Sequence, residues 1–245
     1  MYTNDKVFLV DILGMTNHCN LRCDYCDWAK FDYSPLTESE KQKVHQHLIE
    51  ARHFIEMHYP NAQMIEYSGG EPFTHPEIVM DALDVFHDKL FRVISNALLI
   101  KPEHIQKMTQ HNKAYLGISL DGITEKANYD RGLNQYQLKK ILKTLDWAMD
   151  AGVPVMLLCT LSKDNIDEFY HYIDVIYQKY QKFVDEGLLA MPAHMLASYS
   201  VTHRHATDEQ IARFKQSLSS TKNPLVTKIP EHYQLLFDYD RTLQC

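Results

Sequence analysis

The chain has 245 residues, with 25 Lys and Arg against 32 Asp and Glu and a formal net charge of −7. Hydrophobic residues make up 45% and charged residues 23%, so the disordered, collagenous and low-complexity classes are excluded. The acidic balance argues against a general nucleic-acid binder, and no apolar run approaches the roughly 18 residues that span a bilayer. The first residues lack the basic region of a signal peptide, and we therefore expect a cytoplasmic protein that binds neither nucleic acid nor membrane.

Strands and helices are predicted to alternate along the chain. Strands are predicted at residues 7–13, 64–68, 91–95, 114–120, 153–161 and 188–197. Three helices are predicted to follow capping boxes that begin at Thr37, Thr74 and Thr207. Another is predicted to begin after an Asn134 cap and to end at Gly152. Two more are predicted to begin at Pro102 and at Asp164 or Asn165. Six strands separated by helices indicate parallel βαβ units with right-handed crossovers.

The predicted fold class is α/β, a partial (β/α)6 TIM barrel of parallel strands with a short C-terminal appendage. A full eight-unit barrel takes about 250 residues, whereas six units here use most of the first 200. We expect a barrel core over residues 1–200 and a C-terminal extension over 201–245. A flat, doubly wound sheet is the alternative, but no Gly-x-Gly-x-x-Gly follows the first predicted strand.

Three of the five cysteines lie close together, at Cys19, Cys23 and Cys26. A short loop with these spacings can place three thiolates around one face of a [4Fe–4S] cluster, leaving one iron open. The alternative is a zinc site completed by His18 or a distant histidine, although structural zinc usually takes paired couplets of ligands. The residues alone leave both kinds of site open.

Other polar and glycine residues follow the predicted strands on the same rim as these cysteines. Ser68-Gly69-Gly70-Glu71-Pro72 ends the second strand, Ser95-Asn96 the third and Ser119-Leu120-Asp121-Gly122 the fourth. Active sites of parallel α/β folds lie at the carboxyl ends of the strands, so this convergence predicts one site. Each segment also has a plainer interpretation as a strand-end turn, and we interpret Asp121-Gly122 as a turn rather than as catalytic.

Cys19-x3-Cys23-x2-Cys26 together with Gly69-Gly70-Glu71 resembles the motifs of the radical S-adenosylmethionine (SAM) enzyme family. The resemblance covers about residues 7–197. It implies a partial barrel and one [4Fe–4S] cluster whose open iron is chelated by the amino and carboxylate groups of SAM. It further implies reductive cleavage of SAM to methionine and a 5′-deoxyadenosyl radical that abstracts hydrogen from a substrate.

The same resemblance implies roles for eleven residues. The three cysteines would hold the cluster, while the SAM contacts would come from Tyr25, Gly69, Gly70, Glu71, Ser95, Asn96, Ser119 and Arg131. Glu71 would meet the SAM ammonium, Tyr25 the adenine, and Ser95 and Asn96 the ribose. Ser119 and Arg131 would bind the SAM carboxylate. Tyr25 has the alternative role of simply covering the cluster.

Residues 118–122 and 129–132 resemble a narrower branch, which holds sulfatase maturases and ribosomal-peptide maturases. This likeness implies a peptide or protein substrate and an electron donor such as flavodoxin or ferredoxin. Members often carry a C-terminal region with further cysteines for auxiliary clusters. Here the sequence ends at Cys245. Either it stops where such a region would begin, or it is a short variant without auxiliary clusters. The alternatives are an activase of glycyl-radical enzymes and a non-enzymatic iron–sulfur or zinc interaction module.

The remaining conspicuous residues have plainer expected roles. Cys159 is predicted to be an inert core thiol, because free cysteines are often buried. Trp28, Phe31 and Tyr33 are predicted to screen the cluster from water. The segment 203–205 is predicted to be a solvated loop that could contact substrate.

Overall fold

The computed structural model describes residues 9–13, 16–26, 30–31, 34–191 and 205–227. Their central feature is a sheet of six strands, in which all neighbouring strands pair in parallel. The strands are β1 (Leu9–Leu13), β4 (Met64–Ser68), β5 (Leu90–Ser95), β6 (Ala114–Ser119), β7 (Val155–Leu158) and β8 (Leu189–Ala190). A separate short pair joins β2 (His18–Cys19) to β3 (Lys30–Phe31).

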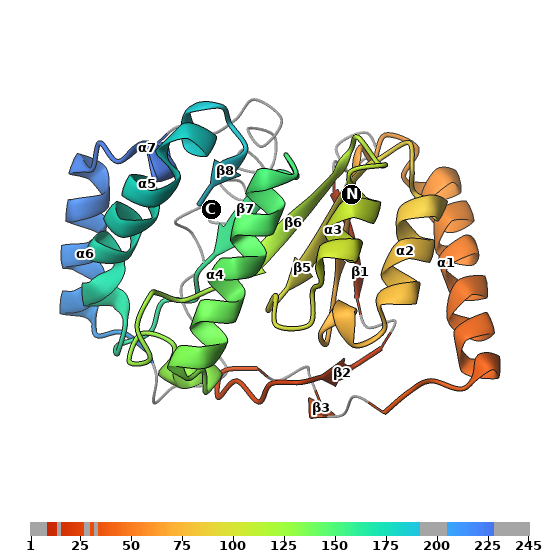
Figure 1. Cartoon of the computed structure of the whole chain (residues 1–245), viewed down its shortest axis with the longest axis horizontal. Coiled ribbons are helices and arrows are strands. Elements are labelled where there is room, and N and C mark those ends of the chain that lie inside the picture. Colours follow the sequence, from red (N-terminus) through yellow and green to blue (C-terminus); the bar gives the residue numbers. More distant parts are fainter. Residues whose placement is uncertain (1–8, 14–15, 27–29, 32–33, 192–204, 228–245) are drawn as a thin grey trace.

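Helices connect the strands, and the first six follow one another in chain order across the molecule, whereas the short last helix lies back beside the fifth (Figure 1). They are α1 (Glu38–His58), α2 (Pro76–Val85), α3 (Pro102–Met108), α4 (Gln135–Asp150), α5 (Phe169–Asp185), α6 (Asp208–Ser220) and α7 (Pro224–Thr227). Short 3₁₀ turns are η2 (Pro72–Thr74), η3 (Tyr129–Arg131) and η4 (Ile166–Glu168).

The order of the strands decides between the two predicted arrangements. It runs β1-β4-β5-β6-β7-β8 and never reverses. Right-handed crossovers in one direction place all helices on one face, whereas a doubly wound sheet reverses order and carries helices on both faces. The partial barrel is therefore confirmed.

Alternate residues of each strand enter two different apolar layers. Side chains such as Ile65, Val93 and Leu116 are buried between the sheet and the helices. Their neighbours on the opposite face, Met64 and Tyr115 among them, form a smaller cluster on the concave side of the sheet. This period of two leaves the carboxyl ends of the strands as the place where polar side chains gather.

The capping boxes predicted at Thr37 and Thr207 are present, and the cap predicted at Asn134 is also a capping box. Thr37, Asn134 and Thr207 each accept a hydrogen bond from the third helical residue, whose side chain bonds back to the cap. Gly152 follows α4 with a φ of 72°, as expected of a glycine that ends a helix.

The box predicted at Thr74 is wrong. The Glu71 side chain accepts from the Phe73 backbone N–H, which starts the 3₁₀ turn η2, and Thr74 donates to the Glu71 carbonyl. Helix α2 begins only at Pro76, after an N-cap at His75 that makes no side-chain cap bond.

Two predicted strands are shorter in the structure. The strand predicted at 153–161 is confined to β7, because Thr160 donates its backbone N–H to the Asp121 side chain and leaves the sheet. The strand predicted at 188–197 is observed at Leu189–Ala190, and residues 192–197 lie outside the described residues. So do Trp28, Tyr33, His203, Arg204 and Cys245.

The described part of the C-terminal extension packs on the barrel. The ring of Phe214 meets that of Phe169 edge to face at 5.2 Å, and Tyr170 donates to the Phe214 carbonyl at 2.8 Å. The Met191 backbone N–H donates to the Leu225 carbonyl. No helix in the described part of the chain is both long enough and apolar enough to cross a membrane.

Candidate functional site

A pocket of about 370 Å³ opens at the carboxyl ends of β4, β5 and β6. Each of these strands ends in a serine that lines it, namely Ser68, Ser95 and Ser119. All eleven predicted site residues line this pocket: Cys19, Cys23, Tyr25, Cys26, Gly69, Gly70, Glu71, Ser95, Asn96, Ser119 and Arg131. Four further residues line the pocket, namely Leu21, Ser68, Ile94 and Thr160; Ser68 belongs to the predicted rim, and no ligand contact was predicted for any of the four.

The three cysteines lie on one loop that rises from buried to exposed. Cys19 is buried, Cys23 is half-buried and Cys26 is exposed. The loop turns tightly, because the Cys26 backbone N–H donates to the Cys23 carbonyl at 3.0 Å. Leu21 directs its backbone N–H at the Cys19 Sγ at 3.4 Å, a contact that favours a thiolate.

Burial dominates the chemistry of these thiols. It raises the pKa of Cys19 to about 11, and it also raises the pKa of Cys23. The negative charges of the neighbouring cysteines act in the same direction on Cys19. Burial therefore favours the protonated form of Cys19 and Cys23 until a cationic group binds and displaces the protons.

The donor set fits an iron–sulfur cluster. Three soft thiolates are the usual ligands of iron in such clusters. Within the described ranges, no three His, Cys, Asp or Glu side chains are grouped to hold a single metal ion. His18, the predicted fourth zinc ligand, instead has its Nδ1 3.0 Å from His75 Nε2. The three-thiolate donor set therefore fits the cluster.

The two glycines allow the cysteine loop to approach the end of β4. A Cβ on Gly70 would lie 2.1 Å from the His18 carbonyl oxygen, and Gly69 has a φ of 133° that favours glycine. The next residue, Glu71, donates its backbone N–H to that same carbonyl at 2.6 Å. We expected the glycines to admit a ligand; for Gly70 the close neighbour is the chain's own backbone.

Glu71 is the buried acceptor at the centre of the pocket wall. Its carboxylate accepts from Ser95 Oγ and the Asn96 N–H, both at 2.7 Å, and from the Phe73 N–H at 3.0 Å. Only 2% of the residue is exposed, and burial raises its pKa to about 6 despite these bonds. Glu71 therefore orders the ends of β4 and β5 in addition to any contact with a ligand.

Asn96 links this wall to the cysteine loop. Its side-chain amide donates to Asn20 Oδ1 at 2.9 Å, and its own Oδ1 accepts from the Leu98 backbone N–H. Asn20, which lies between two of the cysteines, was not singled out in the sequence. Its place inside the cysteine motif was the available signal.

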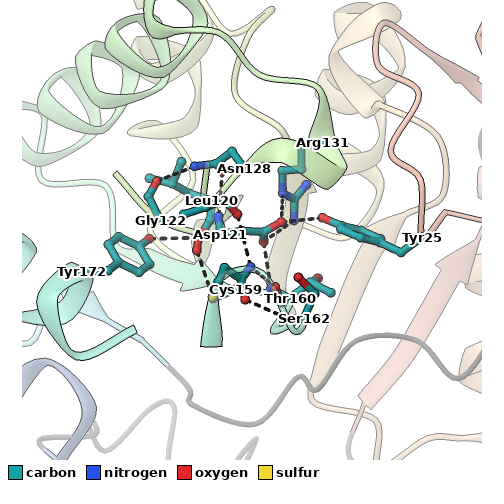
Figure 2. Close-up of polar contacts among 12 residues, drawn as sticks. Tyr25, Leu120, Asp121, Gly122, Asn128, Arg131, Cys159, Thr160, Ser162 and Tyr172 are labelled. Carbon is teal, nitrogen blue, oxygen red and sulfur yellow. Dashed lines mark hydrogen bonds and ion pairs between the residues drawn. The ribbon is translucent and has the colours of Figure 1, made fainter. Parts of the chain in front are cut away.

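Arg131 and Tyr25 meet at a carboxylate that sequence reasoning interpreted as turn chemistry (Figure 2). Arg131 forms a two-bond fork with Asp121, at 2.8 Å from Nε and 3.0 Å from Nη2. Tyr25 donates its hydroxyl to the same carboxylate at 2.8 Å. The interpretation of Asp121 as a turn residue is therefore incomplete. The signal that could have indicated its ion pair was an acidic residue at the end of a barrel strand, ten positions before an arginine.

Cys159 has no part in the pocket. It is buried beneath Asp121, with its Sγ 3.6 Å from the Asp121 carbonyl oxygen, and burial raises its pKa well above the ordinary value. This agrees with the predicted core thiol.

A family model described as the radical SAM superfamily matches residues 13–176, more than half of the chain. Among curated proteins, the Fe-coproporphyrin III synthase of Methanosarcina barkeri is 27% identical over 176 residues, covering 71% of this chain and 42% of that protein. The GTP 3′,8-cyclase of Staphylococcus haemolyticus is 24% identical over 189 residues, covering 71% and 54%. The chain thus spans about half the length of these relatives.

Among solved structures, Streptococcus suis SuiB bound to S-adenosylmethionine aligns with a TM-score of 0.62 and 14% identity, covering 86% of this chain and 47% of SuiB. SuiB has also been solved with its precursor peptide SuiA. At this identity the likeness concerns the fold, and it matches the open parallel barrel described above.

Proposed function

The chain belongs to the radical SAM superfamily and is an enzyme of that class, and we propose that it modifies a side chain of a peptide substrate. Members of this superfamily use a [4Fe–4S] cluster and SAM. Family membership excludes the non-enzymatic module considered above. The substrate, the roles of individual residues and the division into a core over 1–200 and an extension over 201–245 are proposals.

The lining of the pocket supports the proposed roles. Cys19, Cys23 and Cys26 would hold the cluster, and the remaining eight predicted residues would hold SAM. When bound, these groups supply a one-electron cleavage of a sulfonium and a carbon radical able to abstract hydrogen.

The chain's own residues prepare this pocket for a charged ligand. Glu71 presents a buried carboxylate whose charged form is stabilised by three donors, so a ligand ammonium would be attracted to it. Ser119 offers a hydroxyl at the end of β6, and Leu21 and Ile94 supply apolar walls that limit water. The buried cysteines would exchange their protons for iron on loading.

Two observations bear on the substrate. The narrow likeness at 118–122 and 129–132 and the fold shared with SuiB, a protein solved with a precursor peptide, support a peptide. The names of two curated relatives give a tetrapyrrole as the product of one and a nucleotide, GTP, as the substrate of the other, and they favour a small-molecule substrate as the second candidate. A glycyl-radical activase would instead require a protein partner.

Anaerobic reconstitution with iron and sulfide, followed by dithionite and SAM, tests the enzyme class. We expect release of 5′-deoxyadenosine and a paramagnetic signal of the reduced cluster that changes when SAM is added. Cys26→Ala should lose both, whereas the matched variant Cys159→Ala should keep them, because Cys159 lies outside the pocket.

Substrate is assigned by comparing three additions to the reconstituted enzyme: a library of short peptides, GTP and a panel of free tetrapyrroles. A peptide substrate should accelerate 5′-deoxyadenosine release and change in mass. Acceleration by GTP or a tetrapyrrole alone would refute the peptide proposal while leaving the enzyme class intact. The electron donor, which we propose to be a flavodoxin or ferredoxin, can be tested by replacing dithionite with each protein.

A further inference from the structure

Asp121 is a buried carboxylate that accepts four hydrogen bonds. Only 3% of the residue is exposed. Its Oδ2 accepts from Tyr25 and Arg131, and its Oδ1 accepts from the second nitrogen of the Arg131 fork and from the Thr160 backbone N–H at 2.8 Å. Figure 2 shows these groups converging on one side chain from different parts of the chain.

The donors come from three segments that border the pocket. Tyr25 lies within the cysteine loop, Arg131 lies in η3, and Thr160 follows β7. A backbone bond from the Asp24 N–H to the Asp130 carbonyl, at 2.7 Å, joins the cysteine loop to η3 at the neighbouring positions. Asp121 therefore ties the loop between Cys23 and Cys26 to the ends of the central strands.

Asp121 also balances a buried positive charge beside the cysteine loop. Arg131 is 7% exposed and lies with its guanidinium 5.4 Å from the centre of the Tyr25 ring. Its charge acts on Cys23 as well as on Asp121. A buried guanidinium without its carboxylate would be costly and would leave an uncompensated cation next to the thiols.

We propose that Asp121 is a positioning residue, which holds the cysteine loop against Arg131 through the Tyr25 hydroxyl and neutralises the Arg131 charge there. The part of this inference that concerns the bound cluster rests on the proposed function. The loop-holding part concerns the chain alone.

Asp121→Asn keeps the size of the side chain and removes its charge. Because all four contacts are donated to Asp121, an amide nitrogen on either side would face an N–H of Arg131, and one bond of the fork would be lost. The matched control is Asp146→Asn. Asp146 also accepts from a tyrosine, Tyr180 at 2.6 Å, and pairs with a cation, Lys179 at 2.9 Å, but on the outside of the barrel.

Two measurements on the full chain test the proposal. In the iron-free protein, hydrogen exchange at residues 19–26 should be at least several-fold faster in Asp121→Asn than in wild type or Asp146→Asn. In the reconstituted protein, the reduction potential from a titration of the paramagnetic signal should be more positive in Asp121→Asn, because the unbalanced cation favours added negative charge. A merely structural role would not move the potential. Wild-type values for either measurement would overturn the proposal.

If Asp121→Asn does not fold, a milder pair of variants tests whether Asp121 holds the cysteine loop. Tyr25→Phe removes one hydrogen bond and no charge, so it should speed hydrogen exchange at residues 24–26 and leave the reduction potential unchanged. The control variant Tyr180→Phe should leave both the exchange rate and the reduction potential unchanged. Unchanged exchange in Tyr25→Phe would then overturn the proposal. If the wild-type chain takes up no iron, the proposed function fails, and the exchange comparison still decides whether Asp121 holds the loop.

Discussion

At the scale of single residues, Glu71 is ionised at neutral pH at a cost to stability. Burial raises its pKa from 4.5 to about 6, so the folded protein binds the proton more tightly than the unfolded chain. Its contribution to stability is present in full below about pH 4.5 and is lost as the pH rises through about 6. The loss amounts to about 2 kcal/mol.

Glu71→Gln isolates this effect. Between about pH 4.5 and 7.5, the unfolding free energy of the wild type should fall by about 2 kcal/mol relative to that of Glu71→Gln, since glutamine does not titrate. Urea unfolding of both proteins at each pH measures this difference. A difference that is independent of pH would contradict the assignment.

Gly70 is the second residue whose environment makes a sharp prediction. In Gly70→Ala the new Cβ would collide with the His18 carbonyl next to Cys19, so we expect a stability loss of about 1–3 kcal/mol together with reduced iron uptake. Gly152→Ala is the control: its φ of 72° costs about 1 kcal/mol, but its Cβ meets nothing within 4 Å. Iron content after reconstitution separates them, and equal iron in both variants would count against the close approach.

At the scale of secondary-structure elements, an ion pair inside the barrel joins neighbouring strands. Glu66 of β4 and Arg92 of β5 are opposite each other in register, and their side chains are 11% and 12% exposed. Asp11 of β1 stands opposite Glu66, so Arg92 is the cation facing two carboxylates in this layer.

Removing the charge of Arg92 alone should therefore lower the unfolding free energy more than removing the charges of Arg92 and Glu66 together. Arg92→Met is expected to cost about 3–5 kcal/mol, because it leaves the buried Glu66 carboxylate uncompensated, and adding Glu66→Gln should recover most of this loss. Chemical denaturation of the single and double variants measures both values. Equal stability of the two variants would show that the pair contributes no such coupling.

At the scale of the whole molecule, the packing of α6 on α5 makes the described C-terminal segment part of one cooperative unit. Phe214→Ala should lower the unfolding free energy of the entire chain by about 3–5 kcal/mol, since it opens a cavity against Phe169 and Tyr170. Phe54→Ala, at a position that is 54% exposed on α1, should change stability little.

Unfolding followed by circular dichroism and by fluorescence distinguishes one unit from two. A single transition that shifts with Phe214→Ala is expected. If the proposed boundary between 200 and 201 separated independent domains, the main transition of the barrel would stay unchanged in this variant.

The amino-acid sequence by itself determined the α/β class with parallel strands, and its resemblance to the radical SAM family indicated all eleven pocket residues proposed to bind cofactors. Apolar runs, caps such as Thr37 and a terminal Gly152 are local signals, and the strand ends of any parallel barrel meet at one rim. Local patterning could not foresee that Glu71 would start a 3₁₀ turn and displace the cap predicted at Thr74.

Only the tertiary structure decided which partners these residues have. Asp121 has the local pattern of a turn, and its three side-chain and backbone partners come from positions 25, 131 and 160. Likewise Gly70 faces the chain's own His18 backbone, and the Arg131 fork closes on a carboxylate of the chain. The physical reason is that buried charges and close backbone contacts depend on distances between segments far apart in sequence, which no local pattern encodes.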